Sequence, residues 1–174
     1  MDETTRRWLL RAVGTGVVAG TAGCSASSGR AAGNDAPTLP GSDYPTIDEW
    51  LQTSDVGRPA TNYHGEVLDW TGRDTVTISV GADGNEGNFA YGPPAVVVST
   101  GTVVEWSWTG LGNPHDVVAR PADQLGESDY TFDSDGMKDG SGVKFTTTMD
   151  QQGIALYHCT PHLSLGMKGG IAVE

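Results

Sequence analysis

One short segment near the end of the chain carries three residues of the kind that bind soft metal ions. Cys159, His162 and Met167 follow the spacing Cys-x2-His-x4-Met. A thiolate, two imidazoles and a weak thioether are the donor set of a blue copper electron-transfer site. His115 can supply the second imidazole if a neighbouring strand brings it close. The pattern therefore predicts one copper ion, alternating between Cu(I) and Cu(II), with these four residues as its ligands.

The same residues have alternative readings that must be compared with copper. Zinc could use a Cys and two His, but it would prefer a better fourth donor than Met, or a water. Taken singly, a Cys can be a small buried apolar residue and a Met can fill a core. The four residues together favour copper, because three strong donors and one distant Met change little when an electron arrives. They also leave no open position for a substrate.

The chain has two cysteines, Cys24 and Cys159. In an exported protein the usual expectation would be a disulfide between them. A disulfide would deprive the predicted metal site of its thiolate. Because Cys24 lies in a processing motif and Cys159 lies among His and Met, we expect the two cysteines to remain separate.

Short runs that alternate apolar and polar residues indicate the elements that position these ligands. With 25 glycines and no long helical period, the chain is typical of an all-β protein, an antiparallel Greek-key β-sandwich. One short helix is expected at Ile47–Leu51, with Thr46 as its N-cap. Residues 142–149 and 153–158 are expected to pair with each other, and residues 83–88 and 124–142 to be loops, the second long enough to contain a short helix or strand. The expected strands are residues 75–80, 95–99, 102–108, 116–120, 142–149, 153–158 and 169–173.

The N-terminal residues indicate export. Residues 1–23 resemble a twin-arginine signal peptide, with Arg6 and Arg7 followed by apolar residues. A short membrane helix is the alternative, but residues 12–22 are too few and too Gly-rich for a span of about 20 apolar residues. Cys24 ends a lipobox-like motif that departs from the usual pattern at Thr21, where Leu is common. We therefore expect residues 24–45 to be a lipidated flexible tether and residues 46–174 to form the folded domain.

The charge of the chain restricts its partners. A formal net charge of −12 argues against nucleic acid, since phosphate binding needs Lys and Arg. The acidic residues are scattered, which indicates a strongly solvated surface and fits a salt-loving source. An acidic docking face for a basic partner is the alternative.

Three segments resemble the plastocyanin-like cupredoxins. They are Val80–Asn85, Val104–Gly110 and the loop that begins at Cys159, and the resemblance extends roughly from Trp50 to Glu174. It implies a blue copper domain over residues 46–174 and a copper ion held by the four ligands named above. It also implies a small electron shuttle that is not an enzyme by itself.

The chain departs from this family at two positions beside the ligands. Asp116 stands where plastocyanins have an Asn that ties the first His strand to the Cys strand. A carboxylate there accepts hydrogen bonds but cannot donate them when ionised, and such groups around a ligand tune the metal. His158 stands where plastocyanins have a Tyr, and strand alternation predicts that it points outward and is exposed.

These observations predict a monomer that shuttles single electrons at the outer face of the cell membrane. It would be exported, attached to lipid through Cys24, and would dock weakly and transiently with membrane-bound redox proteins. Two alternatives are the electron-entry domain of a copper oxidoreductase, which would need more than the four His of this chain, and a copper-binding carrier. The docking surface would be an apolar collar around His162, made by Leu111, Pro114, Pro161, Leu163, Leu165 and Gly166.

Overall fold

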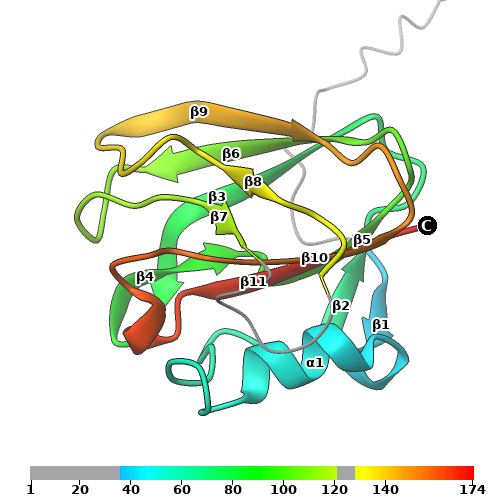
Figure 1. The fold of residues 1–174 in the computed structure, drawn as a ribbon, viewed down its shortest axis with the longest axis horizontal. Helices are drawn as coiled ribbons and strands as arrows, with labels where there is room; N and C mark the ends of the chain where they lie inside the picture. Colours follow the sequence, from blue (N-terminus) through cyan, green and yellow to red (C-terminus); the bar gives the residue numbers. More distant parts are fainter. Residues whose placement is uncertain (1–35, 121–127) are drawn as a thin grey trace, which may run out of the picture. The chain divides into compact units, whose positions relative to one another are not determined.

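The computed structural model describes residues 36–120 and 128–174. Within these residues the strands form two facing sheets, with the orders β1-β2-β5-β11-β10-β7-β8 and β4-β3-β6-β9 (Figure 1). The predicted β-sandwich is thus confirmed, although the pairs β2–β5, β5–β11 and β3–β6 are parallel. The elements in chain order are β1 (Thr38–Pro40), a 3-10 turn η1 (Gly41–Asp43), α1 (Pro45–Gln52), β2 (Glu66–Asp69), β3 (Thr75–Gly84), β4 (Gly87–Gly92), β5 (Ala95–Val98), β6 (Val103–Thr109), β7 (Val118–Ala119), β8 (Phe132–Asp133), β9 (Ser141–Thr148), β10 (Gly153–His158), a 3-10 turn η3 (Leu163–Leu165) and β11 (Lys168–Val173).

The main core lies between the two sheets. In β6, Val104, Trp106 and Trp108 are buried, and the residues between them are partly exposed. This alternation is what a strand with one face on the core requires. Trp106 packs edge-on against Tyr157 of β10, with ring centroids 4.7 Å apart. The four tryptophans in the described residues, Trp50, Trp70, Trp106 and Trp108, are all buried and act as packing residues.

A second, smaller core lies on the outer face of the seven-stranded sheet. There α1 packs against β10 and β11, on the side away from the four-stranded sheet (Figure 1). Its Ile47, Trp50 and Leu51 are fully buried. Because both faces of this sheet are covered here, β5 and β11 are buried along their whole length instead of alternating.

The helix begins earlier than the sequence suggested. α1 starts at Pro45 with Tyr44 as its N-cap, so the prediction of Thr46 as the N-cap was wrong. Proline suits the first helical position because its fixed φ is helical and its missing N–H would have no partner there.

The predicted pairing of residues 142–149 with 153–158 was also wrong. β9 pairs with β6 in one sheet, whereas β10 pairs with β11 and β7 in the other. A connection as short as residues 149–152 can close a hairpin or cross between two sheets, and strand pattern alone does not distinguish the two. Here Met149 is fully buried in the main core at this crossing.

Residues 83–88 are a tight hairpin instead of a loop. β3 continues to Gly84 and β4 starts at Gly87, with Asn85 and Glu86 at the turn. Both turn residues have positive φ, 57° and 64°, as a type I′ hairpin turn requires. The loop expected at 124–142 does contain a short strand, β8, in its described part.

The described fold starts before residue 46. β1 pairs with β2, so residues 38–43 belong to the sandwich and not to the expected tether. The signal peptide, Thr21 and Cys24 lie outside the described residues. No helix among residues 36–120 and 128–174 is long and apolar enough to cross a membrane.

Candidate metal centre

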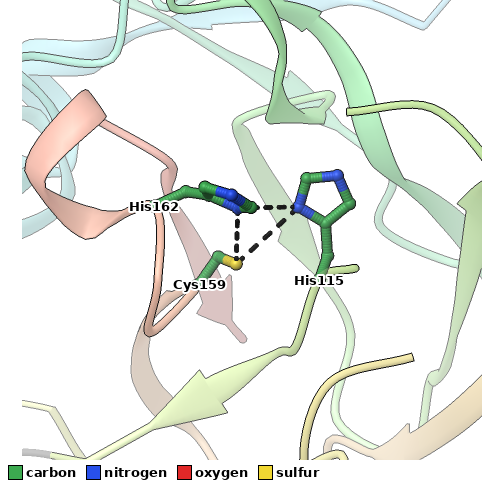
Figure 2. Close-up of side chains that lie close together, drawn as sticks. All are labelled: His115, Cys159 and His162. Carbon is green, nitrogen blue, oxygen red and sulfur yellow. Dashed lines mark hydrogen bonds between the residues drawn. The ribbon is translucent and has the colours of Figure 1, made fainter. Parts of the chain in front are cut away.

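Three of the four predicted ligands meet at one end of the sandwich. The Nδ1 atoms of His115 and His162 lie 3.1 Å apart, and the Sγ atom of Cys159 lies 3.8 Å from the first and 3.3 Å from the second. Figure 2 shows the three side chains pointing toward one another. Two donors bound to one ion at about 2.0 Å (nitrogen) and about 2.3 Å (sulfur) would lie about 3.6 Å apart. The arrangement therefore fits a single metal ion at its centre.

Sheet topology explains why residues far apart in sequence meet here. Cys159 directly follows β10, and β10 pairs with β7 through His158 and Val118. His115 lies three residues before β7, so it reaches the same end of the sheet as Cys159. His162 follows on the turn that leads into η3.

The ring of His115 has a defined orientation and tautomer. Its Nε2 lies 2.9 Å from the carbonyl oxygen of Leu111, which can only accept a hydrogen bond. Nε2 must therefore carry the proton, and in the neutral ring Nδ1 has a free lone pair for a metal. The backbone is held as well, since the indole N–H of Trp108 donates to the His115 carbonyl at 3.1 Å. Burial lowers the pKa of His115, which favours this neutral form.

Two glycines let the backbone approach the His115 ring closely. A Cβ on Gly81 would lie 3.0 Å from His115 Nε2, and one on Gly112 would lie 2.9 Å from the same atom. Both glycines have positive φ, 84° and 79°. Larger residues at either position would push the ring away from the centre.

Cys159 is a buried free thiol with no exposed surface. Burial raises its pKa, so a thiolate at this position needs a nearby cation. A bound metal ion supplies such a charge and deprotonates a coordinating thiol. The chemistry of this donor therefore fits a metal ion as well as its geometry does.

Asp116 joins the segment that contains His115 to the segment that contains Cys159. Its Oδ1 accepts a hydrogen bond from the backbone N–H of Thr160 at 2.7 Å. The side chain is nearly buried, at 5% exposed. The connection between these two segments that the family makes with Asn is thus made here by a carboxylate, which accepts the hydrogen bond.

Met167 is fully buried and belongs to the same core cluster as Cys159. Its N–H donates to the His162 carbonyl at 3.2 Å, and its own carbonyl accepts from the Cys159 N–H at 3.1 Å. The backbone therefore places Met167 beside both residues, and its role as the fourth ligand stays a prediction.

Phe89 is a site residue that the sequence did not reveal. Its ring lies 4.7 Å from the His162 ring and 6.3 Å from the His115 ring, measured between centroids. It belongs to β4, the strand that was read as a loop in part. Recognising the hairpin turn before it would have predicted a strand there, and with it an aromatic side chain near the ligands.

His158 is buried, so the expectation of an exposed side chain was wrong. It does point to the outer face of the sheet, but it is 2% exposed because α1 covers that face. Its ring lies against Trp50, with centroids 6.5 Å apart. By contrast, His64 is exposed.

The chain is similar to known copper proteins. Residues 76–174 match the model of a family described as copper binding proteins, plastocyanin/azurin family. A halocyanin of Natronomonas pharaonis is 40% identical over the whole length of both chains. A plastocyanin of Scenedesmus fuscus is 30% identical over 57% of this chain and 99% of its own. The structure of oxidized plastocyanin from Dryopteris crassirhizoma matches 57% of this chain and 100% of its own, with 25% identity and a TM-score of 0.44.

The family model and the similarity to the halocyanin confirm the resemblance that the sequence motifs indicated. The family match covers His115, Cys159, His162 and Met167, and copper is the cofactor of this family. The chain therefore belongs to the plastocyanin/azurin family of copper-binding proteins, the cupredoxins.

Proposed function

We propose that this protein carries single electrons, and that His115, Cys159, His162 and Met167 hold its copper ion. The observation that carries the proposal is the convergence of two imidazole nitrogens and one buried sulfur within 4.8 Å. Bound copper would supply the exchange between Cu(I) and Cu(II). The task of the chain is then to hold the donors still and to exclude other ligands.

The donors are held in place by groups around them. Leu111 fixes the His115 ring, Asp116 fixes the residue after Cys159, and the Met167 backbone joins Cys159 to His162. Ligands whose rotamers are locked by surrounding hydrogen bonds keep their geometry in both oxidation states. Such rigidity favours fast electron transfer.

Burial of the donors supports a carrier rather than an enzyme. Cys159 and Met167 have no exposed surface and His115 is 1% exposed. A substrate would need an open coordination position and a path to it. With these three side chains enclosed, the one approach that they leave is along His162.

His162 is the expected exit for the electron because it is the partly exposed member of the set. Around it, Leu111 is 55% exposed and Pro161 is also exposed, whereas Gly166 is buried and contributes no surface to the collar. A small apolar surface around a ligand suits weak and transient docking of a redox partner. We propose that these partners are membrane-bound redox proteins.

The proposed location rests on the N-terminal residues. A twin-arginine signal over residues 1–23 would export the chain, and lipid on Cys24 would hold the domain at the outer face of the membrane. A single acyl chain binds membranes only marginally, so the attachment would be reversible unless a second signal reinforces it. Replacing Cys24 by Ser should move the protein from the membrane fraction to the medium, and mass spectrometry of the membrane fraction should find the lipid on Cys24 of the unaltered chain.

Visible spectroscopy of the purified protein tests the proposed function. We expect an intense blue absorption that disappears on addition of a reductant and returns on reoxidation, with one copper per chain. A colourless protein that binds copper or zinc would contradict the proposal.

A further inference from the structure

A segment that precedes the matched family region packs against the ligand-bearing end. It consists of α1 and the loop that follows it, residues 45–62, which we call the brace. We propose that the brace is a positioning element of the metal centre, and that Lys168 locks it to the strand that follows Met167. The proposal rests on the copper site proposed above. It assigns no ligand to the brace; it assigns control over how firmly the ligands are held.

Lys168 is the first contact. It follows Met167 directly and is 1% exposed, although its side chain ends in a charge. Its Nζ donates to the carbonyl oxygens of Thr53 and Val56, at 3.0 Å and 3.2 Å. Burying an ammonium group is costly unless hydrogen bonds compensate it. The two hydrogen bonds of this buried ammonium group join the end of α1 to the strand beside a predicted ligand.

Trp50 reinforces the same junction from the helix. Its indole N–H donates to the carbonyl oxygen of Gly169 at 3.1 Å, and its ring lies 4.9 Å below the Lys168 ammonium. This cation–π distance is within the range of attraction. The ring also covers His158, the neighbour of Cys159. Trp50 therefore contacts residues next to two of the predicted ligands.

The loop of the brace touches the turn between His162 and Met167 through backbone atoms. A Cβ on Gly57 would lie 2.0 Å from the carbonyl oxygen of Leu163, and one on Gly166 would lie 2.5 Å from that of Pro59. Both glycines also have positive φ. A larger residue at either position would therefore clash with the facing backbone and strain its own backbone. At such close approach the turn cannot shift outward without moving the brace.

A third contact links the brace to Phe89. The N–H of Thr61 donates to Asn85 Oδ1 at 2.9 Å, and the Asn85 N–H donates back to Thr61 Oγ1 at 2.7 Å. The Asn85 side chain then donates to the Phe89 carbonyl at 2.6 Å. Since the Phe89 ring packs on His162, the brace is also linked to this predicted ligand through Phe89.

These contacts predict that loosening the brace frees the ligand turn without removing a donor. The Lys168→Met variant tests this because it keeps the length and apolar stem of the side chain and removes the ammonium. Lys144→Met is the matched control, since it makes the same charge change on β9 in the other sheet. Hydrogen exchange of the copper-free protein is measured first, at the turn amides of Leu165, Gly166 and Met167.

In Lys168→Met we expect exchange at these three amides to rise about tenfold over wild type, because two partly buried carbonyls lose a charged donor, while amides of β6 are unchanged. Copper loss to a chelator should also be about tenfold faster, the scale seen when a group that orients ligands is removed. Lys144→Met should leave both rates unchanged. Lys168→Arg, which keeps a charged donor, should recover part of the loss.

Thr61→Val provides an independent variant should Lys168→Met fail to fold, because it removes one hydrogen bond of an exposed side chain. It should raise turn exchange and copper loss in the same direction by a smaller factor. The proposal is overturned if Lys168→Met or Thr61→Val lowers overall stability but leaves turn exchange and copper loss equal to those of Lys144→Met. A wild-type protein without blue absorption would instead contradict the proposed function, and the exchange data on the copper-free protein would still decide the role of the brace.

Discussion

The two parts of the described chain contribute differently to the metal centre. Residues 76–174, which match the family model, contain all four predicted ligands and the strands that bring them together. Residues 36–75 contain none of these ligands. They add β1 and β2 to one edge of the seven-stranded sheet and place α1 over its outer face.

This difference separates the identity of a metal site from its rigidity. Donor types and strand topology decide which metal fits and where it lies. Packing around the donors decides how far they can move, and here part of that packing comes from residues outside the matched region. Variants in the two parts should therefore change different measured properties. Those in residues 76–174 should change the absorption or reduction potential of the copper site, and those in residues 36–75 should change the free energy of unfolding.

Replacing Cys159 by Ser should have the largest effect. The change removes the thiolate, the soft donor that distinguishes a blue copper site from an imidazole site. We expect the intense visible absorption to vanish and copper to be held more weakly, while far-ultraviolet circular dichroism of the domain is retained. A Cys159→Ser protein that keeps the blue absorption would show that the thiolate is not a ligand.

Replacing Trp50 by Ala tests whether residues 36–75 contribute to the stability of the fold. Trp50 is fully buried between α1 and the sheet. Removing a buried Trp side chain costs about 3–5 kcal/mol, so the free energy of unfolding measured with urea should fall by about that amount. Trp50→Phe, which keeps an aromatic ring but loses the hydrogen bond to Gly169, should cost less. If Trp50→Ala changes the free energy of unfolding by less than about 1 kcal/mol, residues 76–174 would be stable without the helix.

Replacing Asp116 by Asn should change the metal centre without affecting the brace. A negative charge near copper favours the oxidised ion, so removing it should raise the reduction potential. For one electron, a tenfold shift in the balance of the two states corresponds to about 59 mV, and we expect a rise of that order or smaller in voltammetry. The amide of Asn can still accept the Thr160 hydrogen bond, so the absorption spectrum should stay blue. An unchanged or lower potential contradicts this prediction.

Sequence spacing sufficed to predict that His115, Cys159 and His162 lie together, because chemistry tightly restricts the residue types of a soft-metal site. Cys159, His162 and Met167 lie on one short segment, so their proximity follows from chain connectivity. His115 required only that its strand lie beside the Cys strand, which the sandwich provides. The strands of alternating residues were predicted for the same reason, since period two leaves a direct trace in the sequence.

The features that sequence could not give depend on contacts between distant segments. His158 was expected to be exposed because alternation tells which face a residue occupies, but not whether a helix covers that face. β9 and β10 were assigned to one hairpin because the sequence between them does not say which sheet each strand joins. Lys168 gave no signal of burial, since the acceptors of its ammonium lie more than a hundred residues earlier in the chain.

The smallest predicted effect concerns acid stability in the earlier part of the chain. Asp69 accepts hydrogen bonds from the N–H and the hydroxyl of Thr71, at 2.9 Å and 2.7 Å, and these bonds lower the pKa of its carboxyl below the ordinary value of 3.8. A carboxyl with a lowered folded pKa stabilises the fold above pH 3.8, and this contribution is lost as the pH falls through the folded value. Because the group lies at the surface and is partly exposed, Asp69→Asn should change the free energy of unfolding at pH 7 by less than about 0.5 kcal/mol.

The difference between wild type and Asp69→Asn should shrink further as the pH falls from 5 to 3. Urea unfolding of the copper-free protein measures it best, since acid also protonates the metal ligands and would release copper. Asp83→Asn, which removes a charge from an exposed residue of β3, controls for the general change in net charge. A difference that stays constant from pH 5 to pH 3 would mean that the Thr71 hydrogen bonds do not favour the ionised carboxylate.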